Sequence, residues 1–137
     1  MSLRNIIIII LLTLSIIDLT ATYIYVRTYR NWQPNKPYNL MENNPLLTFL
    51  WNNIGLELGM LVGACIILTL IYLVGKSAWM PLVILLLLVL LYTIYKHYVN
   101  FNLLYKLIKM YPSGYLPEAI FGVVIGNNEK KINKKNN

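Results

Sequence analysis

Three acidic side chains and the single histidine lie within or beside long apolar segments of this sequence: Asp18, Glu42, Glu57 and His97. An ionised carboxylate in hydrocarbon costs several kcal/mol, so each acid is expected to be protonated, paired or open to water. Carboxylates and an imidazole are also groups that bind cations and transfer protons. If the fold brings the four together, they could hold a metal ion or act on a lipid.

Asp18 belongs to a polar stripe on the first apolar segment. Other polar side chains share its helix face at helical spacing, namely Ser15, Thr22, Tyr25 and Tyr29. Such a stripe normally faces the interior of a helical bundle rather than lipid. Packing between helices is the conservative interpretation, and a proton, ion or headgroup site is the alternative.

Glycines recur at every fourth position of the second apolar segment, at Gly55, Gly59 and Gly63. A row without side chains lets another helix backbone approach closely. We expect this row to pack against the first or third helix of the same chain, and a seam between copies in a homo-oligomer is the alternative.

Glu57 lies roughly 200° around the helix from Gly55, so it needs a partner away from the glycine row. An antiparallel second and third helix would bring Lys96 and His97 to a similar depth. The sequence therefore predicts an ion pair between Glu57 and one of these two residues.

No catalytic or metal motif accompanies these residues. His97 is the only histidine, Cys65 the only cysteine, and the patterns HExxH, CxxC and GxSxG do not occur. We therefore predict no catalytic residue, no metal and no cofactor, which disfavours an enzyme without excluding one.

The composition identifies the elements that must position these groups. Of the 137 residues, 58% are hydrophobic and only 12% are charged, against about 25% charged in soluble domains. Three segments, about 6–26, 46–74 and 80–100, are apolar nearly all round and reach the ~20 residues that span a bilayer. The predicted fold is an all-α membrane bundle with three transmembrane helices in one domain, 1–126.

The segment ends carry recognisable signals. Asn44 and Pro45 are suited to the N-cap and first position of the second helix, and Glu42 just before them is favoured by the helix dipole. Gly75 and Pro81 predict a tight turn before the third helix, which is expected to continue to about Met110 and to end at the YPSG sequence. The range 115–126 is too short to span and predicts an interfacial segment, and 127–137 predicts a disordered lysine-rich tail.

The basic residues predict the orientation. In a three-span chain, Arg4 and Lys76 lie on one side and the other ten on the opposite side. The positive-inside rule then places the N-terminus outside and the C-terminus in the cytoplasm of a cell-membrane protein. A cleaved signal peptide is the alternative for the first segment, although its hydrophobic run is too long for one. Nucleic acid is not expected as a partner, because the charges flank apolar spans.

A DxxxT...ExNPL pattern links the first two segments. Its residues are Asp18, Thr22, Glu42, Asn44, Pro45 and Leu46. This pattern resembles that of a small prokaryotic family of uncharacterised integral membrane proteins with about three spans. The resemblance implies a membrane address and a helical fold, not an activity. Tyr92 or Tyr95 together with His97 matches a tyrosine and a histidine that this family tends to carry near the end of its last helix.

Three functions follow as hypotheses. The glycine row favours a non-enzymatic accessory or scaffold subunit in a homo-oligomer or a larger membrane complex. Asp18 and Glu57 favour an oligomeric pathway for an ion, a proton or a small solute. Asp18, Glu42 and His97 would be the working residues of a lipid-acting membrane enzyme. The candidate polar cluster for all site-based hypotheses is Asp18, Thr22, Glu42, Asn44, Glu57, Lys96 and His97.

Overall fold

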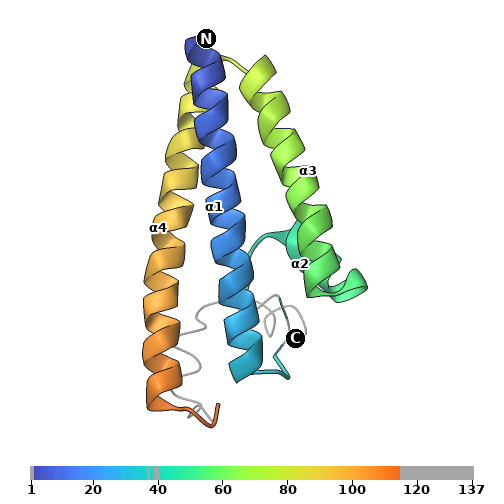
Figure 1. The fold of residues 1–137 in the computed structure, drawn as a ribbon, viewed down its shortest axis with the longest axis vertical. Helices are drawn as coiled ribbons and strands as arrows, with labels where there is room; N and C mark the ends of the chain where they lie inside the picture. The colour runs from blue at the N-terminus through green and yellow to red at the C-terminus, as the bar shows by residue number, and fades with distance from the viewer. Residues whose placement is uncertain (1, 37, 39–40, 115–137) are drawn as a thin grey trace, which may run out of the picture.

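The computed structural model describes residues 2–36, 38 and 41–114, which form four α-helices and no strand (Figure 1). Three helices are long and apolar enough to cross a membrane: α1 (Leu3–Trp32), α3 (Leu56–Ser77) and α4 (Met80–Met110). The fourth, α2 (Pro45–Ile54), has only ten residues. The prediction of an all-α bundle with three membrane-spanning helices is confirmed, whereas the predictions for 115–126 and 127–137 lie outside the described residues.

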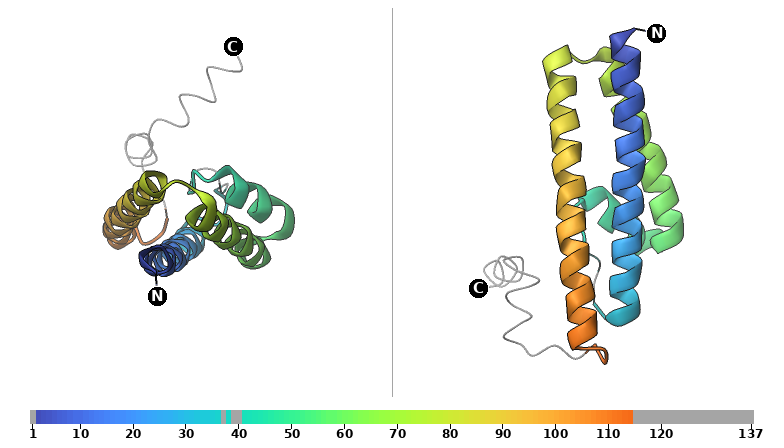
Figure 2. Two further views of the ribbon diagram at one scale, coloured as in Figure 1. Left: turned by 90° about the horizontal axis from the view of Figure 1, so that it is seen from above. Right: turned by 60° about the vertical axis from the view of Figure 1, so that its left-hand side comes forward.

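The long helices are arranged around α1. Both α3 and α4 pack along α1, and the turn that joins them lies beside the start of α1 (Figure 1 and Figure 2). The Arg4 guanidinium fixes this end of the bundle, because it donates hydrogen bonds of 2.8 Å to the carbonyls of Lys76 and Ala78. These are carbonyls at the end of α3 that lack helical partners, so the arginine serves as a cap.

The short helix α2 and the four residues before it form a re-entrant segment, 41–54. After α1 ends at Trp32, the chain turns back toward the middle of the bundle, where Asn44 starts α2. The helix α2 then runs antiparallel to α3, since Leu47 lies against Gly63 and Trp51 against Gly59. The chain reverses once more at Gly55 and continues as α3.

The expectation of one continuous second helix over 46–74 is therefore wrong. Gly55 separates α2 from α3 with φ 85° and ψ 168°, a conformation that is essentially restricted to glycine. The start of the segment was predicted correctly, because Asn44 is the N-cap of α2 and Pro45 occupies its first turn. The Asn44 side chain accepts hydrogen bonds from the amides of Leu46 and Leu47.

The glycine row also packs differently from the prediction. Gly59 and Gly63 are buried against α2 rather than against the first or third long helix. A Cβ at Gly59 would lie 2.8 Å from the Trp51 ring and 3.0 Å from the Leu50 carbonyl carbon. Because α2 fills this face of α3, a second copy of the chain has no access to Gly59 or Gly63.

The other helix ends agree with the sequence signals except at Gly75. The helix α4 continues to Met110 and ends at Tyr111, as the YPSG sequence indicates. Gly75 does not end α3, which continues to Ser77; it is buried against Ile8 of α1, where a Cβ would meet Ile8 Cγ1 at 2.9 Å. Gly75 therefore permits close packing of α3 on α1.

Candidate functional site

A polar cavity of about 290 Å³ lies where α1, α3, α4 and the re-entrant segment meet. Its apolar walls come from Leu19, Leu47, Ile67, Ile71 and Leu90. Its polar residues are Ser15, Asp18 and Thr22 of α1, Glu42 and Asn44 of the re-entrant segment, and Thr93 and His97 of α4. Five of the seven residues predicted for the polar cluster therefore line a single cavity.

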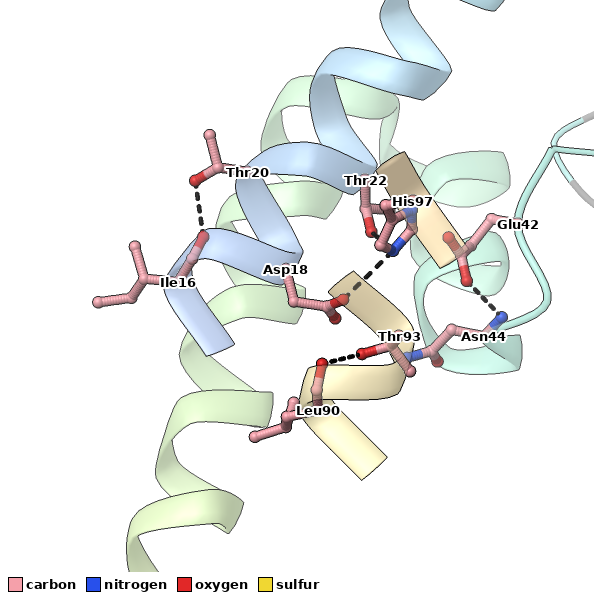
Figure 3. Close-up of polar contacts among 9 residues, drawn as sticks. All are labelled: Ile16, Asp18, Thr20, Thr22, Glu42, Asn44, Leu90, Thr93 and His97. Atoms are coloured by element: carbon pink, nitrogen blue, oxygen red, sulfur yellow. Dashed lines mark hydrogen bonds and ion pairs between the residues drawn. The ribbon is translucent and has the colours of Figure 1, made fainter. Parts of the chain in front are cut away.

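The centre of the site is the contact between α1 and α4 (Figure 3). His97 Nε2 lies 2.9 Å from Thr22 Oγ1 and 3.3 Å from Asp18 Oδ1. His97 Nε2 thus lies between a hydroxyl and a carboxylate. A protonated Nε2 can donate to either oxygen, whereas an unprotonated Nε2 can only accept from the Thr22 hydroxyl. Asp18 and Thr22 reach the same ring because they are four residues apart on one face of α1.

Asp18 is incompletely satisfied at this position. The 3.3 Å contact with His97 is close enough for an ion pair but lacks the alignment of a hydrogen bond, and Oδ1 is buried without a hydrogen-bond donor among the described residues. The side chains of Asp18 and His97 are nevertheless 21% and 18% exposed, and both line the cavity. A buried carboxylate oxygen that lacks a donor is a position at which a proton, a cation or an N–H group would bind favourably.

The re-entrant segment forms the opposite edge of the site. Glu42 Oε1 accepts a hydrogen bond of 2.8 Å from the Asn44 amide, just before the Asn44 side chain caps α2. The two side chains thus extend the capping of α2 into the cavity, where the partial positive charge of the helix N-terminus favours the Glu42 carboxylate. The sequence predicted only that the helix dipole favours a charge at Glu42, whereas the structure gives its carboxylate a specific partner, the Asn44 amide.

Two further hydroxyls line the cavity but are already used. Ser15 donates to the Leu11 carbonyl at 2.6 Å, and Thr93 donates to the Leu90 carbonyl at 2.9 Å. Thr93 was missed in the sequence, although its position four residues before His97 places both on one face of α4. Ser15, Thr22 and Tyr29 are buried, so the prediction that this stripe of α1 faces the bundle is confirmed.

Glu57 and Lys96 do not join the site. Glu57 is exposed at the start of α3 and accepts a hydrogen bond of 3.3 Å from Tyr23, while Lys96 Nζ lies 6.0 Å from the centre of the Tyr92 ring. The predicted pair of Glu57 with Lys96 or His97 is therefore wrong. It assumed that the second and third long helices pack side by side, whereas α1 lies against both of them and Asp18 of α1 engages His97.

The acids and the histidine do not form a metal site among the described residues. No three side chains of the types His, Cys, Asp and Glu approach one another closely enough in residues 2–36, 38 and 41–114 to hold an ion. A divalent cation bound only by protein normally takes at least three such ligands.

Comparison with known proteins gives no match: no family model, no curated protein and no solved structure matches this chain.

Proposed function

We propose that this membrane protein binds a proton or a small monovalent cation in the polar cavity and passes it through the bundle. The observation that carries the proposal is the buried Asp18 Oδ1, which has no hydrogen-bond donor among the described residues and lies 3.3 Å from His97 Nε2. Ionisable groups buried in membrane helices normally mark ion pathways or proton relays. The pathway that we propose uses Asp18, His97 and Glu42, and not Glu57, which lines a different cavity.

The residues of the DxxxT...ExNPL pattern support a site-based function. Asp18, Thr22, Glu42 and Asn44 come from two separate stretches of the chain, and all four line the cavity. Membership of the family that this pattern resembles remains a proposal. If it is correct, the pattern describes the two walls of a single site.

Vesicle flux measurements test the proposal. The full chain is reconstituted into liposomes with an imposed pH gradient, in sodium or potassium buffer, and an internal dye follows the gradient. We expect faster dissipation than in protein-free vesicles with at least one of these cations. Asp18→Asn and His97→Gln should each slow the protein-dependent rate about tenfold or more, since each removes a charge-assisted contact.

Glu57→Gln is the matched control, because it neutralises a carboxylate on the same bundle outside the cavity. It should leave the flux unchanged. Wild-type vesicles that dissipate the gradient no faster than empty ones, or an Asp18→Asn variant with the wild-type rate, would contradict the proposal.

A lipid-acting enzyme is the second candidate, favoured by the convergence of Asp18, Glu42 and His97 on one cavity. Its working residues coincide with those of the proposed pathway, so the two are separated by their products. Release of a headgroup or fatty acid from liposomes of the lipids used for reconstitution, dependent on His97, would favour the enzyme.

The accessory or scaffold role loses its main support. It was expected from the glycine row, and α2 of the same chain now accounts for the burial of Gly59 and Gly63. We rank it below the two site-based functions.

We further propose the orientation in which the N-terminus is outside and the C-terminus cytoplasmic. The support is the distribution of charge in the fold: Arg4 and Lys76 lie at the end of the bundle that holds the α3–α4 turn, and Arg27, Arg30 and Lys109 lie toward the opposite end.

A further inference from the structure

A second cavity lies between α1 and α3. It is a groove of about 370 Å³ lined by Ile16, Leu19, Thr20, Tyr23, Glu57, Met60, Leu61, Ala64 and Leu68. Leu19 is the one residue that it shares with the lining of the polar cavity. Whatever occupies this groove is therefore bound separately from the proposed proton or cation.

The walls of the groove suit a hydrocarbon chain. The Thr20 hydroxyl donates to the Ile16 carbonyl at 2.7 Å, so its hydrogen-bonding capacity is used within α1. From Glu57 to Leu68 the groove follows eleven residues of α3, about 16 Å. This length is about half of a ~30 Å hydrocarbon core, the depth of one leaflet.

At one end of the groove a single hydroxyl, that of Tyr23, bridges two opposite charges. Arg27 Nη1 donates a hydrogen bond of 3.0 Å to the Tyr23 hydroxyl, which in turn donates to Glu57 Oε1 at 3.3 Å. The Arg27 guanidinium carbon also lies 5.8 Å from the centre of the Tyr23 ring. Arg27 and Glu57 are both exposed, so each has hydrogen-bonding capacity left for a ligand.

This end of the groove coincides with the end of the apolar run of α1, where the headgroups of a bilayer are expected. Arg27 is the first charged residue after the apolar run of α1, and Glu57 lies in the first turn of α3. An arginine beside a carboxylate is complementary to a phosphate beside an ammonium group. A primary ammonium can donate hydrogen bonds to Glu57, which a quaternary ammonium cannot, and a headgroup with net negative charge would be repelled by Glu57.

We propose that the groove between α1 and α3 binds one phospholipid with a primary-amine zwitterionic headgroup, such as phosphatidylethanolamine. One acyl chain lies along the apolar walls, the phosphate binds Arg27, and the ammonium group binds Glu57.

Native mass spectrometry of the full chain tests this assignment. The protein in mild detergent is mixed with equal amounts of phosphatidylethanolamine, phosphatidylcholine and phosphatidylglycerol that carry the same acyl chains, and the retained lipid is identified by mass. We expect phosphatidylethanolamine to be retained about fivefold over each of the others, as for a partly exposed charge pair.

Three variants locate the site. Glu57→Gln should abolish the preference for phosphatidylethanolamine over phosphatidylcholine, and Arg27→Gln should lower retention of all three lipids. Ala64→Leu should lower retention of all three by filling the groove. Asp18→Asn is the control, since it changes an acid outside the groove and should keep the wild-type preference.

Equal retention of the three lipids by the wild type would overturn the assignment, and so would a preference that survives Glu57→Gln. Retention unaffected by Ala64→Leu would place the lipid elsewhere and overturn it equally. These outcomes are independent of vesicle flux, which Glu57→Gln is expected to leave unchanged.

Discussion

At the scale of single residues, the site depends on a few polar atoms buried among aliphatic side chains. Thr22 is 3% exposed, and its hydroxyl makes the shortest contact with the only histidine. Asp18 shares the same ring nitrogen at a longer distance. In a medium of low dielectric constant, removing one member leaves the others without a partner, so each substitution costs more than the hydrogen bond that it deletes.

Thr22→Val tests this coupling. It keeps the β-branched shape and removes the hydroxyl that contacts His97 Nε2. We expect the free energy of unfolding to fall by about 1–3 kcal/mol, the usual cost of leaving a buried polar partner unsatisfied. Thermal unfolding in detergent measures the loss, and Thr22→Ser should restore most of it.

Thr13→Val is the matched control for Thr22→Val. Thr13 is an exposed threonine of α1 whose hydroxyl donates only to the Ile9 carbonyl. Its replacement should change stability by no more than about 0.5 kcal/mol. Equal effects of the two substitutions would show that the hydroxyl of Thr22 has no special partner.

At the scale of elements, the short helix α2 determines where the polar groups lie. Glu42 and Asn44, which line the cavity, lie just before the first residue of α2. Leu47 and Trp51 of α2 pack onto the glycine face of α3. Gly55 permits the reversal between α2 and α3, and Gly59 permits their close approach. The glycines thus support the re-entrant segment, which in turn closes the cavity.

Gly59→Ala and Gly63→Ala should differ although the chemistry is the same. At Gly59 the new methyl group would meet the Trp51 ring at 2.8 Å and the Leu50 backbone at 3.0 Å, so α2 must move. At Gly63 it would meet the end of the Leu47 side chain at 2.5 Å, which can rotate away. We expect a loss of about 1–3 kcal/mol for Gly59→Ala and a change near zero for Gly63→Ala, where the higher helix propensity of alanine offsets the contact.

Thermal unfolding and size-exclusion chromatography in detergent distinguish this packing from a seam between copies. If the glycine row joined two chains, both substitutions would reduce a dimer without lowering the stability of the monomer. A larger loss of stability for Gly63→Ala than for Gly59→Ala would contradict the packing against α2.

The helix α2 also shows which parts of the structure could be predicted from the sequence and which could not. Hydropathy identified the three long helices, and the Asn44–Pro45 pair identified the start of α2, because both signals are local. The break at Gly55 was missed, since a glycine every fourth residue also describes a continuous packing face. The reversal depends on Trp51 and Leu47 finding room beside Gly59 and Gly63, which is a tertiary condition.

The candidate site was predicted in part for the same reason. Helical spacing placed Thr22 with Asp18, and the short NPL signal placed Asn44 near Glu42. Spacing within one helix could not reveal which helices are neighbours. The partner of Glu57 was therefore assigned wrongly. Asp18 and His97 were placed in one candidate cluster, but a direct contact between them was not predicted.

At the scale of the whole molecule, the polar cavity does not lie midway between the two charged ends of the bundle. Asp18 lies twelve residues from the start of the apolar run at Ile6 and eight from its end at Val26. At 1.5 Å per residue these are about 18 Å and 12 Å, so the cavity is closer to the end that holds Arg27 and Arg30. The part of the proposed pathway that runs from the cavity to the end that holds Arg27 and Arg30 would therefore be the shorter part.

The orientation of the bundle determines which compartment the shorter part of the pathway opens to. With Arg27, Arg30 and Lys109 on the cytoplasmic side, a fluorescent protein fused to the C-terminus should fold and fluoresce in bacterial cells, and a C-terminal alkaline phosphatase should be inactive. Replacing Arg27 and Arg30 by Gln, while adding two lysines beside Ser2, should shift part of the population to the opposite orientation. The control variant carries the two lysines beside Lys109 and should strengthen the original orientation. An active alkaline phosphatase fused to the C-terminus of the otherwise unmodified chain would contradict the proposed topology. The shorter part of the pathway would then open to the outside.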